Sequence, residues 1–146
     1  MPAASIRSLT SAEEGAVEDV LRRLREHFSA WPCPPGHEHE LMGFAYYEGC
    51  GHRWECCRAT LAEAAPFALG RALVAHHGFR WVMIRSGRSW RYGVIHPALG
   101  RPIDLASLED GSWNEEEYDE PPSSGRMALD SLDTIVARVG KLASGA

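Results

Sequence analysis

The sequence predicts an α+β fold: an N-terminal helix, a long or kinked central helix, a small antiparallel sheet built on a hairpin at 79–96, and a C-terminal helix. Two observations support this class. Apolar residues recur at helical spacing in three segments, and they alternate after a glycine turn. The 146 residues fit one domain, 1–146, because typical domains hold about 100–150 residues. Two or three strands alone bury too little apolar surface, so the helices must cover one face of the sheet.

The N-terminal helix is predicted over 12–28. Ser11 and Glu14 match a capping box, in which each side chain bonds to the backbone amide of the other residue. Apolar residues then fall on one stripe of a helix: Val17, Val20, Leu21, Leu24 and Phe28. Acidic residues come early in this segment and basic residues late, which suits the helix dipole.

Helical spacing resumes at Trp54 and continues to Leu73, and Gly78 is a suitable stop in the left-handed conformation. Pro66 interrupts this segment. We therefore expect either a kink or two helices that meet near Ala65, the second with the proline in its first turn.

The hairpin combines an apolar run that begins at Phe79 with a turn at Gly87 and an alternating strand. In that strand Trp90, Tyr92 and Val94 share one face, and we expect the rings to lie in the core. Three further elements are expected: a short edge strand at 102–105, a surface loop at 109–125 and a closing helix at about 127–142.

Charge is distributed in blocks along a chain whose net charge is −5. Residues 64–103 contain six arginines and no acid, whereas residues 104–120 contain eight acids and no lysine or arginine. The acidic block either is solvated, folds back over the arginine-rich surface, or docks a protein partner of opposite sign. The candidate docking residues are Glu115, Glu116, Glu117 and Asp119.

All four cysteines and three histidines lie between residues 33 and 57. Cysteine and histidine are the preferred ligands of structural zinc, which takes four of them in a tetrahedron. The candidate ligands are Cys33, His37, Cys50 and His52, with Cys56 as a substitute. The spacing differs from the usual Cys-x-x-Cys pairs, so the alternative is no cofactor, with buried thiols and solvated histidines such as His39.

Several other classes of function find little support in the sequence. No run of about 18 apolar residues is present, so we expect no membrane span. Trp90 and Arg91 should face opposite sides of their strand, and the chain is acidic, so we expect no nucleic-acid partner. Residues 1–9 lack the apolar core of a secretory signal, which predicts a cytoplasmic location.

The stretches 68–73 and 78–82, with the hairpin leading to His96-Pro97 and the sequence at 102–105, resemble a family of bacterial domains of unknown function, DUF3806, over about residues 60–108. That family has no assigned activity, so the resemblance implies no catalytic residue and favours an accessory or interaction protein. The leading hypothesis is a small, cytosolic, non-enzymatic bacterial protein-binding domain, for which an immunity-like role would fit. The alternative is a zinc-stabilised module or a thiol-dependent enzyme centred on 33–57.

Overall fold

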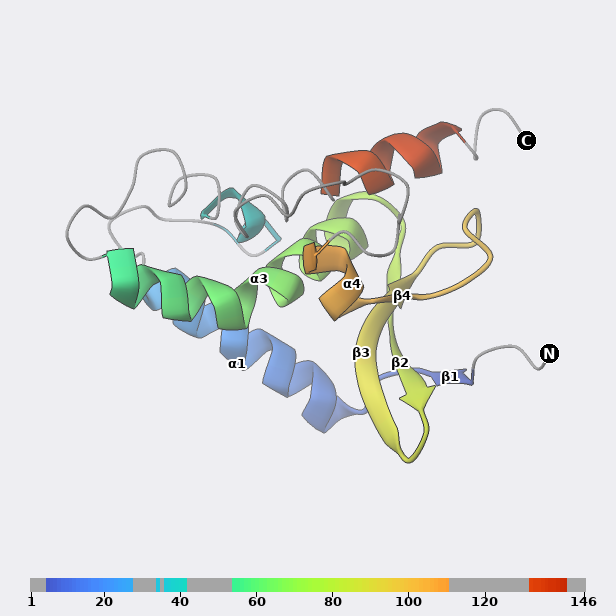
Figure 1. The fold of residues 1–146 in the computed structure, drawn as a ribbon, viewed down its shortest axis with the longest axis horizontal. Coiled ribbons are helices and arrows are strands. Elements are labelled where there is room, and N and C mark those ends of the chain that lie inside the picture. Colours follow the sequence, from blue (N-terminus) through green and yellow to red (C-terminus); the bar gives the residue numbers. More distant parts are fainter. Residues whose placement is uncertain (1–4, 28–33, 35, 42–53, 111–131, 142–146) are drawn as a thin grey trace.

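The computed structural model describes residues 5–27, 34, 36–41, 54–110 and 132–141. The elements follow in the order β1 (Ile6–Arg7), α1 (Ser11–His27), α3 (Trp54–His76), β2 (Arg80–Ser86), β3 (Ser89–Ile95), β4 (Ile103–Asp104) and α4 (Leu105–Asp110). Residues 39–41 and 132–141 are also helical. Helices and an antiparallel sheet therefore form one body, and the predicted α+β class is confirmed (Figure 1).

The sheet has four antiparallel strands in the order β1-β2-β3-β4. Strands β2 and β3 form the predicted hairpin, with pairs running from Arg80↔Ile95 to Ser86↔Ser89. Gly87 turns the chain with a φ of 63°, in the left-handed region that favours glycine. Strand β4 confirms the expected short edge strand, whereas β1 was not predicted. A two-residue strand is too short to show an alternating pattern, and it exists through its pairing with β2.

Helix α1 confirms the N-terminal helix, but its cap lies one residue earlier than predicted. The hydroxyl of Thr10 accepts a hydrogen bond from the Glu13 amide at 3.2 Å, and the Thr10 amide donates to Oε1 of Glu13 at 2.8 Å. The capping box is thus Thr10–Glu13 and not Ser11–Glu14. Both pairs fit the sequence pattern, and Glu13 is the glutamate that also binds Arg7 from β1.

Helix α3 runs without interruption from Trp54 to His76, with Pro66 inside it. The chain therefore forms one long central helix, and the alternative of two helices is wrong (Figure 1). Its described core residues are mostly small: Ala64, Ala65, Ala68, Leu69, Ala72 and Leu73. The helix ends as predicted, because Gly78 has a φ of 75° and the Phe79 amide donates to the Leu73 carbonyl at 3.4 Å.

One hydrophobic core joins α1, α3, α4, the sheet and helix 132–141. Tyr92 lies partly buried against this core, and its ring meets Phe67 edge-on at 5.3 Å between centroids. Trp90, by contrast, is 38% exposed, so its expected place in the core is wrong. It is the second residue of β3, next to the hairpin turn.

Two segments near the C-terminus complete the described fold. Residues 105–110 form α4, which includes the first two residues of the predicted loop at 109–125. This helix starts where the Asp104 carboxylate accepts a hydrogen bond from the Ala106 amide at 2.8 Å. Helix 132–141 is the described part of the predicted closing helix, and it buries Leu132, Ile135 and Val139. No helix in the described ranges is long and apolar enough to cross a membrane.

Candidate functional site

Most of the residues predicted to bind a partner or a metal lie outside the described residues. These are Glu115, Glu116, Glu117 and Asp119 of the acidic block, and Cys33, Cys50 and His52 of the metal set. Cys56 belongs to α3, but its side chain is outside the described part of the chain. His37 is described, so the structure places one of the predicted ligands and the zinc site stays a prediction.

The segment that carries His37 is anchored by Glu38, whose side chain is fully buried. Oε1 of Glu38 lies 3.0 Å from the guanidinium of Arg25 on α1 and 3.6 Å from that of Arg71 on α3. Oε2 accepts a hydrogen bond from the Gly36 amide at 2.8 Å. The carboxylate thus ties residues 36–41 to both helices.

Glu18, seven residues before Arg25 on α1, contacts the same two arginines. It lies 3.0 Å from Arg25 and forms a second ion pair with Arg71. The hydrogen bond from Arg71 is the main reason why the pKa of Glu18 is lowered. We call Glu18, Arg25, Glu38 and Arg71 the Glu38 cluster. Its two acids balance its two arginines, so the cluster has no net charge. Its ion pairs hold α1, α3 and residues 36–41 together, and we call this arrangement a structural clamp.

Three histidines gather beside this clamp. The ring of His37 lies 4.7 Å from that of His76 on α3 and 6.3 Å from that of His39, measured between centroids. Nε2 of His76 lies 3.0 Å from the Gly36 carbonyl, and Nδ1 of His37 lies 3.3 Å from Glu40. The histidines therefore come together, although their sequence positions span 40 residues.

His39 was expected to be a solvated loop residue, and this expectation is wrong. Its ring is half-buried, and its Nδ1 is buried with no hydrogen-bond partner among the described residues. Burial lowers the pKa of this imidazole, against the attraction of Glu40 and Glu38. Within the described part of the chain, no group of three His, Cys, Asp or Glu side chains is placed to hold a metal ion.

The tip of the β2–β3 hairpin is a second surface with distinctive chemistry. Arg85, Arg88, Trp90 and Arg91 are all exposed there, and we call these four residues the hairpin tip. Arg85 and Trp90 are cross-strand partners and share one face, whereas Arg91 lies on the other face, 3.5 Å from Asp104. That ion pair is a direct contact between the arginine-rich and acidic blocks of the sequence.

A chain of contacts fixes the Trp90 ring. The guanidinium of Arg7 lies 4.7 Å from the ring centroid, and both its terminal nitrogens bind Glu13, at 2.7 and 2.9 Å. The Tyr92 hydroxyl donates a 3.5 Å hydrogen bond to the Glu13 carbonyl. The hydrogen bond from Arg7, helped by Thr10, lowers the pKa of Glu13 to about 2. Strands β1 and β3 are thereby joined to the start of α1.

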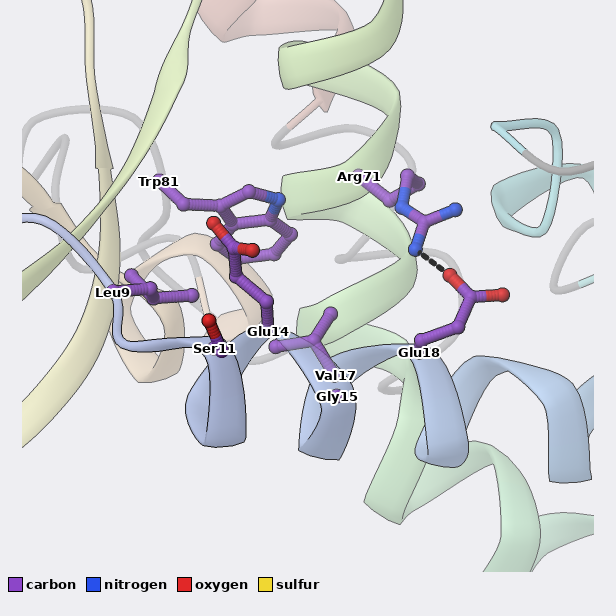
Figure 2. Close-up of a pocket in the computed structure, with 8 residues that line it drawn as sticks. All are labelled: Leu9, Ser11, Glu14, Gly15, Val17, Glu18, Arg71 and Trp81. Carbon is purple, nitrogen blue, oxygen red and sulfur yellow. Dashed lines mark hydrogen bonds and ion pairs between the residues drawn. The ribbon is translucent and has the colours of Figure 1, made fainter.

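A groove of about 460 Å³ runs between α1, α3 and β2 (Figure 2). Helix α1 contributes one wall, Arg71 comes from α3, and the indole of Trp81 comes from β2. The lining residues are Leu9, Ser11, Glu14, Gly15, Val17, Glu18, Arg71 and Trp81. The groove therefore combines an aromatic ring with carboxylates and one guanidinium.

The sequence contains no pattern that marks Arg7, Arg25, Glu38 or Arg71 as members of ion pairs. Arg25 and Arg71 pair with residues far from them in the chain, by 13 positions for Arg25–Glu38 and 53 for Arg71–Glu18, whereas Arg7 pairs with Glu13 six positions away. No local spacing signals such pairs. Signals did exist for the hairpin tip, since its arginines stand in the acid-free block.

No family model, curated protein or solved structure matches this chain. The resemblance to the DUF3806 family over residues 60–108 consequently stays a prediction.

Proposed function

We propose that this chain is a small protein-binding domain that docks an acidic segment of a partner on its hairpin tip. The observation that carries the proposal is the 38% exposure of Trp90, a large apolar side chain whose cross-strand partner, Arg85, is an exposed arginine. Tryptophan and arginine are the residue types most enriched among the side chains that dominate binding energy at protein interfaces.

The tip is preorganised for binding, which strengthens the proposal. Arg7 stacks on Trp90 and is itself held by two hydrogen bonds to Glu13, so the ring is already ordered in the free protein. A partner therefore loses little affinity to the ordering of this side chain. Arg85, the cross-strand partner of Trp90, and Arg88 in the turn are both exposed and supply the positive charge that attracts acidic groups.

A protein partner fits the tip better than a nucleic acid does. Binding of single strands uses several aromatic rings in a row along a basic groove. Here Tyr92 is turned toward Phe67, and Arg91 is on the opposite face, next to Asp104. The chain also carries a net charge of −5, which opposes a polyanion as a whole.

The test uses a fluorescent hexaglutamate peptide with one phenylalanine, titrated with the full chain at low salt. We expect saturable binding that weakens at least fivefold in Trp90→Ala and in Arg88→Gln. Arg22→Gln is the matched control, because Arg22 is an exposed arginine of α1 that pairs with Asp19, and it should leave binding unchanged. Failure of the peptide to bind, or tighter binding of oligo-dT of similar charge, would overturn the proposal.

A zinc-stabilised module is the second candidate. It is favoured by the buried Nδ1 of His39, which has no hydrogen-bond partner among the described residues, although no three described side chains are placed to hold a metal ion. Metal analysis of the purified chain tests it: about one equivalent of zinc, lost together with folding on chelation, supports this candidate. Metal-free protein that stays folded excludes it. We also propose a cytoplasmic location for this protein-binding domain.

A further inference from the structure

We propose that the groove between α1 and β2 binds a guanidinium group, carried either by an arginine side chain of a protein or by a small guanidino compound. This site is separate from the hairpin tip and does not depend on the proposed function. The inference comes from the charges that line the groove, the ring that lines it, and the space left open beside them (Figure 2).

Among the residues that the structure describes, the charges in the groove leave one carboxylate without a partner. Arg71 forms ion pairs with Glu18 and Glu38, and the second carboxylate oxygen of Glu18 binds Arg25. The Glu14 side chain, in contrast, forms no ion pair or hydrogen bond with any residue in the described ranges. An incoming ligand therefore meets a net negative charge that comes from Glu14.

The indole of Trp81 gives this charge an aromatic neighbour. The ring is held in place because α3 has a glycine where it passes: a Cβ on Gly70 would lie 2.6 Å from Cη2 of Trp81. A fixed, partly exposed ring attracts cations to its face, and the attraction is strongest for tryptophan. Glu14 and Trp81 line the same groove, so one cation has access to both.

The groove also has room for such a group. Gly15 forms part of its wall, and a Cβ built there meets nothing within 4 Å. The volume of about 460 Å³ lies in the range of small-molecule sites and is sufficient for one long basic side chain.

A guanidinium suits this combination better than other cations. It is planar, so it stacks on an indole while its edge donates two hydrogen bonds to a carboxylate. An ammonium cannot stack in this way, and calcium requires six to eight oxygen ligands. The groove offers one unpaired carboxylate in its described lining.

The experiment follows the indole N–H signal of Trp81 by NMR during titration of the full chain with N-acetyl-arginine amide. The signal is assigned by its loss in Trp81→Phe. N-acetyl-citrulline amide, which has nearly the same shape without the charge, is the ligand control. We expect a saturable shift with the arginine compound and at least a tenfold weaker effect with the citrulline compound.

Two variants test the assigned residues. Glu14→Gln should weaken binding at least fivefold, whereas Glu26→Gln, an exposed glutamate in the last turns of the same helix, should not change it. Gly15→Leu should abolish binding by filling the groove, with the folded state checked by circular dichroism. Equal shifts with both compounds, or equal affinities of Glu14→Gln and the unchanged chain, would overturn the proposal.

The source of the guanidinium is resolved by a third titration. A protein-borne arginine predicts that a nine-residue peptide with a central arginine binds at least tenfold more tightly than the amide. A small guanidino ligand predicts equal or weaker binding of the peptide. Absence of binding by all three probes contradicts the site altogether.

Discussion

Glu38, which is fully buried, lies 3.0 Å from the guanidinium of Arg25 and thereby joins the segment 36–41 to the last turns of α1. The same carboxylate accepts the Gly36 amide, so both of its oxygens are used. A buried charge is tolerated when it is paired and hydrogen-bonded, and removal of one member leaves the others unpaired.

The substitution Glu38→Gln should therefore lower the free energy of unfolding by roughly 3 kcal/mol. The amide keeps the shape of the side chain but leaves the charge of Arg25 less compensated. Glu18 still contacts both arginines, which keeps the loss near the lower end of the range for buried pairs. Urea denaturation monitored by circular dichroism measures this difference.

Glu40→Gln is the control for that measurement. Glu40 is two residues away, its side chain is 63% exposed, and its described ion-pair partner is His37. Substitution of such a surface group changes stability by no more than about 0.5 kcal/mol. If both variants lose the same small amount, Glu38 does not clamp the segment.

The contact between Glu13 and Arg7 predicts that the free energy of unfolding depends on pH in the acid range. The pKa of Glu13 is lowered to about 2, mainly by the hydrogen bond from Arg7, against an ordinary value of 4.5. The unfolded chain therefore binds a proton that the folded chain does not, and stability is lost as pH falls from about 4.5 toward 2. Above pH 5 this contribution is fully present.

Glu13→Gln should flatten the loss of stability between pH 5 and pH 2.5. The measurement is the urea midpoint at intervals of half a pH unit, for the variant and the unchanged chain. Glu26→Gln, exposed near the other end of α1, should keep the steeper slope. A slope in Glu13→Gln equal to that of the unchanged chain would show that Arg7 does not stabilise the glutamate in solution.

The parts of the fold that could be predicted are those that local patterns determine. The stripe from Val17 to Leu24 predicts the buried face of α1, because residues three and four apart lie on the same side of a helix. The alternation around Gly87 predicts the hairpin for a similar reason. At Pro66 local rules leave two alternatives, a kinked helix or two helices, and the structure has one helix that continues across the proline.

The parts that could not be predicted depend on contacts between distant segments. Glu38 stands between two histidines in the sequence, and no local pattern indicates that it is buried and paired with arginines from two helices. Trp90 belongs to an apolar alternation, yet it stands next to the hairpin turn and is 38% exposed. The groove combines residues of three elements, so no local spacing indicates it.

His39 predicts a second pH dependence at higher pH. Burial lowers the pKa of its imidazole below the usual 6.5, with His37 and His76 acting in the same direction and Glu38 and Glu40 opposing it. The unfolded chain takes up the proton first, so this contribution to stability is present above about pH 6.5 and is lost as pH falls below it.

His39→Gln should reduce the fall in melting temperature between pH 7.5 and pH 5.5. The control is His77→Gln, since His77 is exposed and stands at the end of α3. The pH range for His39 lies above the pH range for Glu13, so one series of buffers separates the two contributions to stability. An unchanged fall in melting temperature would mean that the imidazole is solvated in both states.

Two glycines, one in each long helix, give opposite predictions for the same substitution. A Cβ at Gly70 would lie 2.6 and 2.9 Å from two atoms of the Trp81 ring and 3.1 Å from Leu105, whereas a Cβ at Gly15 meets nothing within 4 Å. Gly15→Ala should therefore stabilise the protein by about 0.5–1 kcal/mol through helix propensity. Gly70→Ala gains the same stabilisation from helix propensity, but its Cβ forces the indole to move. Because overpacking costs about 1–3 kcal/mol, we expect this variant to have a lower free energy of unfolding than the unchanged chain.

The indole is the cause of the expected loss, which makes a double-mutant cycle the decisive measurement. In a Trp81→Phe background the ring no longer reaches as far toward α3, so Gly70→Ala should become neutral or stabilising there. Urea denaturation of the four proteins gives the coupling energy between the two positions. A coupling energy near zero would show that the absence of a side chain at Gly70 does not make room for the indole. The claim that Gly70 holds Trp81 in place beside the groove would then be wrong.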